Sequence, residues 1–248
     1  MSPHPIAKIP ASVPKNEQAY EQLKNALLYA RFRAGEVLSI RTLAGALGTS
    51  TMPVRSAIVR LVAERALEAL PNRGVRVPVL TDDQLNDLFR ARLALEAMAV
   101  ELACDNITAG ELRHLESYEA LIGGALERNR LADAVRANIE FHLALYRASR
   151  SETLVALIEA LYLRFAPFLY RVFESLPDTM AKRALLVHAQ HSAIIEALRK
   201  RDRAQARAAL ESDLAISLTV RAPAHSSPKP SKRQTLRRLV GRKHPVRR

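Results

Sequence analysis

Four polar side chains stand within otherwise apolar helical stretches of the sequence, and their types are those that bind metal ions. Asn138 and His142 are four residues apart, so a helix places them on one face, one turn from each other. His191 and Asp213 lie eleven residues before and eleven residues after a predicted turn at Asp202. In an antiparallel helical hairpin these two are level, about 16 Å from the turn at ~1.5 Å per residue. The four side chains are therefore expected to converge inside a bundle.

Such a convergence predicts a site for a divalent cation. Imidazole nitrogens together with carboxylate and amide oxygens suit Zn²⁺, Ni²⁺, Mn²⁺ or Fe²⁺. A single histidine on an apolar face is more often a hydrogen-bonded core residue, and a single helical aspartate is more often exposed. The metal prediction therefore depends on all four residues together. His188, one turn before His191, is an additional candidate for the same pocket that no motif supports.

The size and composition of the chain are those of a globular protein. Its 248 residues are enough for one large or two ordinary domains, with 48% hydrophobic and 25% charged residues. The longest apolar stretches, such as residues 97–100, are too short to span a bilayer, and the N-terminus lacks the apolar core of a secretory signal. The single cysteine, Cys104, excludes an intramolecular disulfide framework and a cysteine-based zinc cluster. We therefore expect a cytoplasmic protein with no membrane partner.

The excess of positive charge, +13 in total, is concentrated in two parts of the chain. Residues 16–80 hold nine basic and five acidic side chains, and residues 222–248 hold nine basic and no acidic ones. Residues 81–221 are almost balanced, with eighteen basic and twenty acidic side chains. A chain that is basic in one small domain and in a tail suggests a polyanionic partner, of which nucleic acid is the first candidate.

Residues 16–80 have the pattern of a winged helix-turn-helix domain. Two short amphipathic helices follow an initial helix and are separated by a tight turn at Gly48, with Ser50 as the predicted cap of the second. Two extended runs then flank a Pro-Asn-Arg-Gly turn, which predicts a hairpin. Arg73 and Gly74 form the tip of this hairpin, where a glycine allows close approach to a groove.

The predicted second short helix begins with small polar residues that suit close entry into the major groove of DNA. The hydroxyl groups of Ser50 and Thr51 can donate to phosphates, and Arg55, one turn further, can reach a guanine edge or a phosphate. Arg41 begins the preceding helix, which crosses the DNA backbone in such motifs. A solvated or ion-paired surface position is the alternative for either arginine taken singly. The ordered combination of helix, turn, helix and wing predicts double-stranded DNA as the partner.

After residue 80 the pattern becomes entirely helical. Thr81 and Gln84 form a capping box that starts the first of six amphipathic segments. These segments lie near residues 82–105, 109–129, 131–149, 152–175, 179–200 and 203–219. Pro167 is expected to bend or interrupt the fourth segment. The predicted fold class is therefore mostly α, with an N-terminal winged helix-turn-helix and a C-terminal all-helical antiparallel bundle.

The N-terminal part resembles the winged-helix domain of GntR-type bacterial transcription regulators. The residues that carry the resemblance are Gly35-Glu36-Val37-Leu38-Ser39, Leu43-Ala44, Leu47-Gly48-Thr49-Ser50, Met52-Pro53-Val54-Arg55 and Pro71-Asn72-Arg73-Gly74. The resemblance implies that six residues lie at the DNA, namely Arg41, Ser50, Thr51, Met52, Arg55 and Gly74. The family often has Arg-Thr where this chain has Thr51-Met52, which implies a different operator sequence but the same mode of binding.

Residues 81–220 resemble the ligand-binding FCD domain of the FadR branch of the same family, in its shorter, six-helix, VanR-like version. The residues that carry this resemblance are Arg92-Leu93-Ala94-Leu95-Glu96, Asn138 and His142, and Gln190-His191 with Ile194, Ala197, Leu198 and Asp202. The resemblance implies the metal ligands Asn138, His142, His191 and Asp213, with an aspartate in place of the family's usual final histidine. It also implies a small carboxylate effector beside the metal, held in part by Arg92. An i,i+4 ion pair with Glu96 is the alternative for that arginine.

The expected organisation therefore has four parts. They are a flexible arm at residues 1–15, a DNA-binding domain at residues 16–80, a helical ligand-binding and dimerisation domain at residues 81–221 and a disordered basic tail at residues 222–248. The tail is either a solvated segment with no role or a source of sequence-independent affinity for DNA through counterion release.

The sequence as a whole predicts a transcription regulator that acts as a homodimer on a two-fold operator. The resemblance implies repression, modulated by a small organic acid in the helical domain. One alternative is a helical metalloenzyme acting on a small acid, although we find no nucleophile motif and no local acid–base pair beyond the predicted ligands. A second alternative is a sequence-independent DNA-binding protein that relies on its tail.

Overall fold

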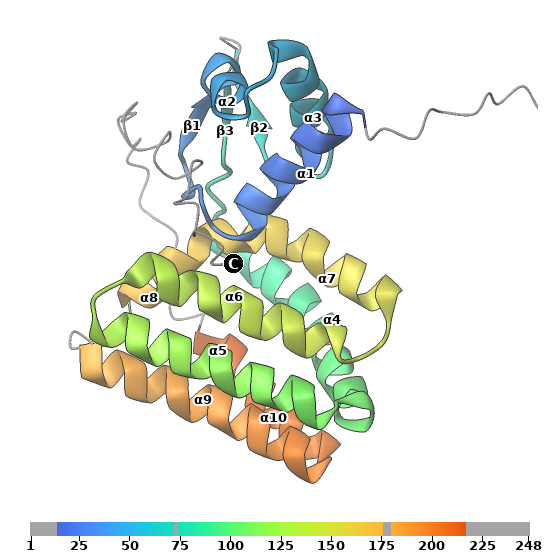
Figure 1. The fold of residues 1–248 in the computed structure, drawn as a ribbon, viewed down its shortest axis with the longest axis vertical. Coiled ribbons are helices and arrows are strands. Elements are labelled where there is room, and N and C mark those ends of the chain that lie inside the picture. The colour runs from blue at the N-terminus through green and yellow to red at the C-terminus, as the bar shows by residue number, and fades with distance from the viewer. Residues whose placement is uncertain (1–13, 72–73, 176–179, 217–248) are drawn as a thin grey trace, which may run out of the picture.

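The structure, a computed structural model, describes residues 14–71, 74–175 and 180–216, with the side chains of 180–185 left aside. A small winged-helix unit sits on one side of a larger helical bundle (Figure 1). The predicted arm, apart from its last residues, the predicted tail and the wing residue Arg73 lie outside the described residues.

The winged-helix unit is built from three helices and three short strands, all within residues 15–76. They are α1 (Lys15–Leu28), β1 (Val37–Ser39), α2 (Ile40–Ala46), α3 (Thr51–Ala63), β2 (Glu68–Ala69) and β3 (Gly74–Arg76). Ser39 caps α2, because its Oγ accepts a hydrogen bond from the backbone N of Thr42 at 3.3 Å. Gly48 has a φ of +62° between α2 and α3, which is the left-handed turn that a glycine adopts without strain.

The wing is a three-stranded antiparallel sheet in the order β1-β3-β2. The β2–β3 pair is the predicted hairpin, with Ala69 opposite Val75. The sequence did not predict β1, which places Leu38 opposite Val75 on the other side of β3. Leu38 and Val75 are both buried, so the inner face of the wing is part of the core that α1 and α3 cover.

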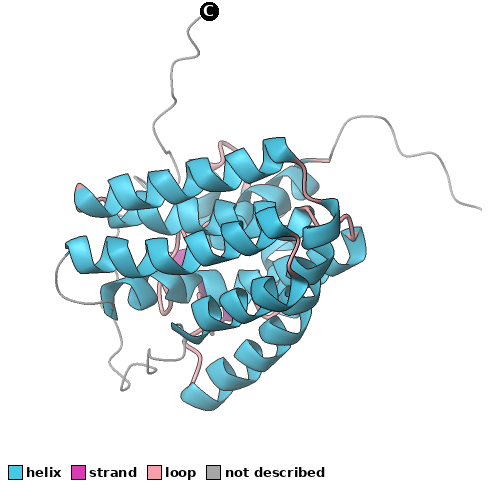
Figure 2. Ribbon diagram, turned by 90° about the horizontal axis from the view of Figure 1, so that it is seen from below, coloured by secondary structure: helices cyan, strands magenta, loops and turns pink. Residues whose placement is uncertain are grey.

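The bundle begins at Thr81, whose side chain and Gln84 form the predicted capping box. Its helices are α4 (Asp82–Asn106), α5 (Ala109–Glu127), α6 (Leu131–Arg147), α7 (Glu152–Phe165), α8 (Leu169–Ser175), α9 (Met180–Lys200) and α10 (Arg203–Ile216). Helix α5 packs between α6 and α9, and α10 packs on α9 and α4 (Figure 1). Seen from below, the long helices lie side by side over most of their length (Figure 2).

Pro167 interrupts the fourth predicted segment, as expected, and divides it into α7, a 3₁₀ turn η1 (Ala166–Phe168) and α8. The run Glu152–Ser175 is nevertheless long and apolar enough to cross a membrane, with a mean hydropathy of 1.4, although the sequence reading found no such stretch. Half of the 18-residue stretch within this run that has this hydropathy is buried within the fold. Its large side chains, including Tyr162 and Phe165, are part of the hydrophobic core, as is typical of a core helix.

The winged-helix unit contacts the bundle through α1 and the loop that follows it. Helix α1 packs on α7 and η1. Lys24 of α1 lies 3.8 Å from the carboxylate of Glu159 on α7. The guanidinium of Arg33 lies 4.6 Å from the centroid of the Tyr170 ring, and its Nη1 is 3.5 Å from Oε1 of Glu174. The two units therefore meet over the α7–η1–α8 segment.

Candidate functional site

Helix α3 presents the residues predicted to contact DNA on its exposed first turn. Ser50 occupies the N-cap position, but its hydroxyl makes no capping hydrogen bond, contrary to the prediction. Thr51, Met52 and Arg55 are exposed, and 67% of Met52 is accessible to solvent. Three polar side chains, those of Ser50, Thr51 and Arg55, are therefore exposed near the N-terminal backbone N–H groups of α3.

The arginines of this unit fall into two groups. Arg41 and Arg55 are exposed, and neither pairs with an acidic residue in the part of the chain that the structure describes. Arg60, five residues after Arg55 on α3, lies 3.2 Å from both Glu17 and Glu64 and stacks 3.5 Å above the Tyr20 ring. Arg60 therefore holds α3 on α1, whereas the other two arginines keep their hydrogen-bond donors available.

Gly74 starts β3 directly opposite Ser39 of β1. A Cβ atom at this position would lie 3.4 Å from the carbonyl oxygen of Leu38, which is close to ordinary van der Waals contact. The pairing of β1 and β3 therefore does not by itself require a glycine here, and the predicted DNA contact stays a prediction.

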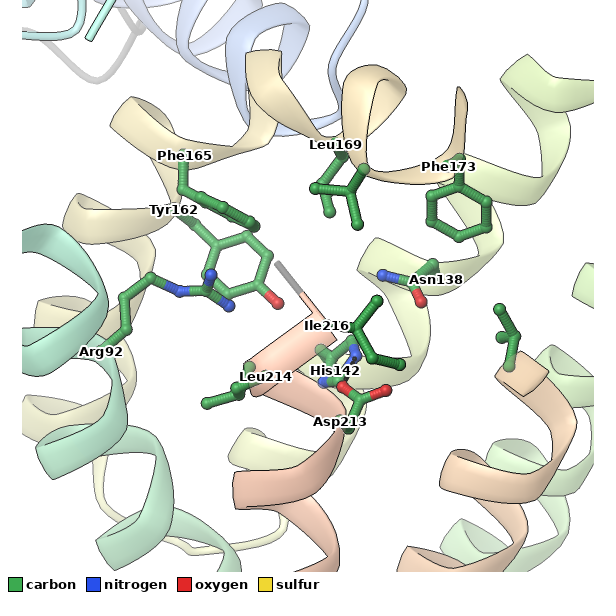
Figure 3. Close-up of a pocket in the computed structure, with 12 residues that line it drawn as sticks. Arg92, Asn138, His142, Tyr162, Phe165, Leu169, Phe173, Asp213, Leu214 and Ile216 are labelled. Carbon is green, nitrogen blue, oxygen red and sulfur yellow. Dashed lines mark ion pairs between the residues drawn. The ribbon is translucent and has the colours of Figure 1, made fainter. Parts of the chain in front are cut away.

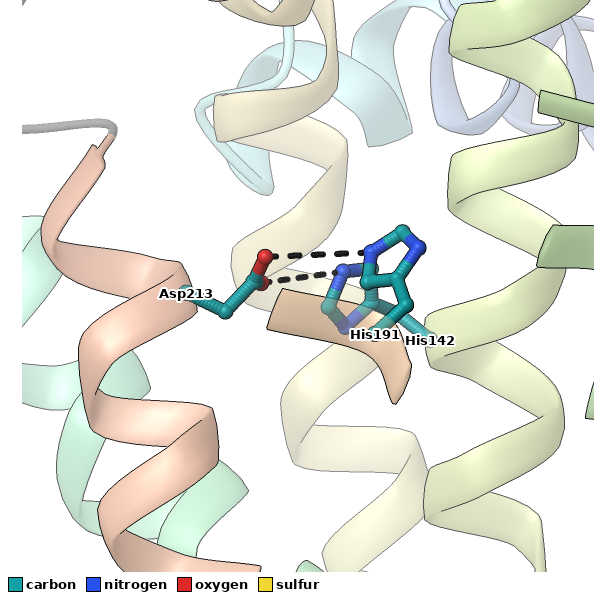
Figure 4. Close-up of side chains that lie close together, drawn as sticks. All are labelled: His142, His191 and Asp213. Atoms are coloured by element: carbon teal, nitrogen blue, oxygen red, sulfur yellow. Dashed lines mark ion pairs between the residues drawn. The ribbon is translucent and has the colours of Figure 1, made fainter. Parts of the chain in front are cut away.

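Three of the four predicted metal ligands come together inside the bundle. His142 of α6, His191 of α9 and Asp213 of α10 each offer a ligand atom, and these atoms all lie within 4.8 Å of one another (Figure 4). His142 Nε2 is 3.3 Å from Asp213 Oδ2, and His191 Nε2 is 3.7 Å from Asp213 Oδ1. The level placement of His191 and Asp213 follows from their equal distance from the turn between α9 and α10.

The electrostatics of this cluster favour a bound cation. His191 is fully buried, and neither of its ring nitrogens has a hydrogen-bond partner among the described residues. Burial lowers the pKa of His191 to about 4 against the opposing charge of Asp213, so the ring is neutral and keeps a lone pair. Burial raises the pKa of Asp213, but the hydrogen bond to His142 and the charges nearby bring it below its ordinary value. Two imidazoles and a carboxylate around an unsatisfied nitrogen suit Zn²⁺ or a similar divalent ion.

Asn138, the fourth predicted ligand, lines a pocket that opens beside this cluster (Figure 3). His142 and Asp213 form its polar end together with Asn138 and Arg92. The rest of the wall is apolar and comes mainly from the α7–α8 segment and the ends of α9 and α10: Tyr162, Phe165, Leu169, Val172, Phe173, Val187, Leu214 and Ile216. His188 does not line this pocket, because it is exposed and pairs with Glu119.

Arg92, the predicted effector contact, forms the alternative ion pair inside the core. Its Nε and Nη2 donate to Oε1 and Oε2 of Glu96 at 2.7 and 3.2 Å, and only 2% of Arg92 is exposed. The guanidinium also lies 3.8 Å from the centroid of the Phe165 ring and 4.9 Å from that of Tyr162. Arg92 therefore lines the pocket with part of its hydrogen-bonding capacity already used.

The sequence reading missed two residues next to the cluster. Tyr146 of α6 donates a hydrogen bond to Glu96 and lies 3.2 Å from His142 Nδ1. Phe141 stacks on the His191 ring with the centroids 4.1 Å apart. The spacing of Tyr146 four residues after His142 was the available signal for the first, and a tyrosine on a core face does not by itself reveal its partner.

A winged helix-turn-helix joined to a helical bundle that contains a largely apolar pocket with a few polar groups defines a class of DNA-binding regulators with a ligand domain. Within that class, the chain belongs to the GntR family and carries an FCD domain. Residues 15–77 match the gntR family of bacterial regulatory proteins, and residues 87–215 match the FCD domain.

Two similar proteins and one solved structure agree with this assignment. The HTH-type transcriptional regulator McbR of Escherichia coli is 34% identical over 64% of this chain and 72% of its own length. The regulator YdhC of Bacillus subtilis is 28% identical over 81% of this chain and 88% of its own length. The solved structure of E. coli McbR/YncC superimposes with a TM-score of 0.76 at 29% identity and covers 84% of this chain and 97% of that one. The protein is therefore an HTH-type transcription regulator.

Proposed function

We propose that this regulator binds a two-fold operator as a homodimer, represses transcription there, and changes its affinity when a small organic acid occupies the helical domain. In this proposal residues 16–80 read the DNA and residues 81–221 bind the ligand and dimerise. Residues 1–15 and 222–248 are a flexible arm and an accessory basic tail. The protein acts in the bacterial cytoplasm, where its DNA lies.

The DNA contacts come from the exposed start of α3, the start of α2 and the wing. Arg55 supplies a guanidinium to a guanine edge or a phosphate, and Arg41 supplies one to the backbone. Ser50 and Thr51 donate to phosphates, and the exposed side chain of Met52 contacts a base edge. Arg73 and Gly74 complete the contact at the wing. The absence of an acidic partner for either Arg41 or Arg55 among the described residues supports this assignment.

The ligand site combines the cluster with the pocket beside it. Asn138, His142, His191 and Asp213 would hold Zn²⁺, Ni²⁺, Mn²⁺ or Fe²⁺. A metal bound there supplies a positive centre that accepts a carboxylate oxygen of the effector. The part of Arg92 that faces the pocket donates to the same carboxylate, and the apolar wall receives the rest of the molecule.

The observation that carries the proposed ligand site is the fully buried imidazole of His191, which has no hydrogen-bond partner among the described residues and lies beside two further ligand side chains. A buried polar group without a partner is unfavourable by about 1–3 kcal/mol, so a cation at this position offsets an existing penalty. Beyond these candidate ligands the sequence shows no nucleophile motif and no local acid–base pair. We therefore assign no catalytic residue.

The test is a DNA titration of the full chain at near-physiological salt. Fluorescence anisotropy would compare the duplex upstream of its own gene with a scrambled duplex, using protein loaded with Zn²⁺ and protein stripped with a chelator. We expect a preference above about 10³-fold for the native sequence. Equal affinity for both duplexes would favour sequence-independent binding by the tail, and zinc-dependent turnover of small acids would favour the enzyme alternative.

A further inference from the structure

A line of buried hydrogen bonds joins the pocket to the candidate metal cluster. It starts at Arg92, which donates twice to Glu96 on the same helix. Tyr146, on the neighbouring helix α6, donates its hydroxyl proton to Glu96 Oε2. The Tyr146 oxygen lies 3.2 Å from Nδ1 of His142, whose Nε2 is 3.3 Å from Asp213. Arg92, Glu96, Tyr146 and His142 are all buried, so water does not compete with the hydrogen bonds among them.

The direction of each hydrogen bond follows from the number of protons available. The carboxylate of Glu96 is paired with a guanidinium and has no proton of its own to donate, so the proton between it and Tyr146 belongs to the tyrosine. A hydroxyl group donates once, and its oxygen can then only accept. The neighbouring His142 Nδ1 must therefore carry a hydrogen and donate it to Tyr146. The ring nitrogen left to face Asp213 and His191 is Nε2, and any hydrogen that it shares with Asp213 must leave when a cation binds there.

We propose that Tyr146 is a positioning residue that fixes the tautomer and orientation of His142, so that Nε2 is the metal-binding nitrogen. This inference rests on the proposed metal site. Histidine ligands commonly donate their second N–H to a carboxylate, which raises ligand basicity and holds the ring. Here the carboxylate of Glu96 acts on His142 through the hydroxyl group of Tyr146. Arg92 in turn fixes Glu96, so a residue of the pocket wall helps to orient a residue of the metal cluster.

Aromatic packing holds the ring of Tyr146 in place, and the side chain of Tyr162 also hydrogen-bonds with it. Tyr146 is fully buried, and its ring meets that of Tyr162 edge to face, with the centroids 6.4 Å apart. His142 precedes Tyr146 by one helical turn, which brings the two polar groups together on the inner face of α6. The tyrosine therefore has its ring held by aromatic packing and its hydroxyl placed between one fixed acceptor and one donor.

The decisive variant is Tyr146→Phe, which removes the hydroxyl and keeps the ring. A chelator competition titration of the full chain with Zn²⁺ alone would give the dissociation constant. We expect zinc binding to weaken about 10–100-fold, the usual effect of removing a group that orients a metal ligand. Tyr20→Phe is the matched control, because Tyr20 is also buried and also donates to a glutamate, Glu64, at 2.8 Å, but in the winged-helix unit. This control should leave the zinc affinity unchanged.

A second measurement reads the tautomer directly in the wild-type protein. Long-range ¹H–¹⁵N correlation spectra of the zinc-loaded chain, with His142 assigned from a His142→Asn variant, should show a protonated Nδ1 and a zinc-bound Nε2. Zinc bound through Nδ1, or equal zinc affinity of Tyr146→Phe and wild type, would overturn the role of Tyr146 and leave the metal site intact. Failure of the wild type to bind zinc would overturn the metal site and this inference together.

Discussion

The two functional regions of this chain treat their polar side chains in opposite ways. On helix α3 of the winged-helix unit, Arg55 is exposed and has no acidic partner among the described residues. Inside the bundle, Arg92 is 2% exposed and is bound twice to Glu96, and Tyr146 is bound to the same carboxylate. His191 makes no hydrogen bond through either ring nitrogen among the described residues, and its nearest charged group is Asp213 at 3.7 Å.

Burial decides whether a polar side chain without a hydrogen-bond partner indicates a binding site. An unpaired guanidinium at the surface is solvated by water, so its lack of a partner is a weak sign by itself. An unpartnered buried imidazole has no water to replace the missing partner, so it is a strong sign of a missing ligand. In this protein the DNA-binding face therefore depends on the family motif for its assignment, whereas the metal cluster is indicated by its own energetics.

The largest effect should come from breaking the buried ion pair. Arg92→Met leaves the Glu96 carboxylate buried without its countercharge, so we expect the free energy of unfolding to fall by about 3–5 kcal/mol. Urea denaturation followed by circular dichroism measures this loss. The matched control is Arg207→Met, because Arg207 lies 2.9 Å from Glu101 and 2.9 Å from Glu211 on the exposed surface. That change should alter stability by less than about 1 kcal/mol.

The double variant Arg92→Met with Glu96→Met shows whether the loss of stability comes from the unpaired charge of Glu96 or from the loss of the ion pair itself. Removing both charges together should recover most of the stability, because no unpaired charge then remains in the core. If the single variant proved as mild as Arg207→Met, the contrast between the buried and the exposed arginines would be wrong.

Zinc addition tests the unpartnered imidazole. Free Zn²⁺ at one hundred times its dissociation constant should stabilise the folded chain by about 2.7 kcal/mol. For a chain of this size that corresponds to a rise in Tm of roughly 5–10 °C, measured by differential scanning calorimetry. A chelator should reverse the rise, and the His191→Ala variant should not show it. A Tm that is the same with and without zinc in the wild type would contradict the assignment.

The exposed arginine of α3 should matter for DNA and little for folding. Arg55→Ala should weaken specific binding by about 1–3 kcal/mol for each half-site, while the Tm stays close to that of the wild type. Arg60→Ala provides the opposite pattern, since Arg60 is paired with Glu17 and Glu64. It should lower the Tm and leave the preference for the native duplex over the scrambled one intact. Anisotropy and thermal melting on the same samples would decide between these patterns.

The smallest effect concerns an ion pair at the edge of the bundle. Arg150 donates to both oxygens of Glu111 at 2.7 and 2.8 Å, and this bond, against the effect of burial, lowers the pKa of Glu111 to about 2. A carboxyl whose pKa is lower in the folded state stabilises the fold above its unfolded pKa and loses that effect as the pH falls towards its folded pKa.

The variant Glu111→Gln should therefore have a slightly lower Tm than the wild type at pH 7. Because the pair is partly solvated, the variant's free energy of unfolding should be lower than that of the wild type by less than about 1 kcal/mol. This deficit should shrink between about pH 5 and pH 2, as the wild-type carboxyl becomes protonated. A deficit that remained constant over this range would show that the charge of Glu111 does not stabilise the fold.

Much of this architecture is readable from local sequence patterns. Apolar periodicity and capping boxes predicted the bundle, and Pro167 predicted the break between α7 and α8. The equal distance of His191 and Asp213 from the turn near Asp202 predicted that they would be neighbours. These features depend on spacing along one helix or across one short turn, which the sequence states directly.

Other features depend on contacts between distant segments, and the sequence carried little sign of them. Strand β1 is three residues long, which is too short for an alternating pattern. Its partner β3 is distant in the sequence, because α2 and α3 come between the two strands along the chain. The bond from Tyr146 to Glu96 joins residues fifty positions apart on different helices. The hydroxyl of Ser50 occupies the expected cap position and still makes no capping bond, because residue type alone does not fix a side-chain rotamer.

The side chains of helix α8 contact two different parts of the molecule. The pocket is lined by Leu169, Val172 and Phe173. Tyr170 and Glu174 contact Arg33, which lies in the loop after α1 of the winged-helix unit. Helix α8 has only seven residues, so these two sets of side chains lie on the same two turns. One short helix therefore carries both a wall of the pocket and part of the contact with the winged-helix unit.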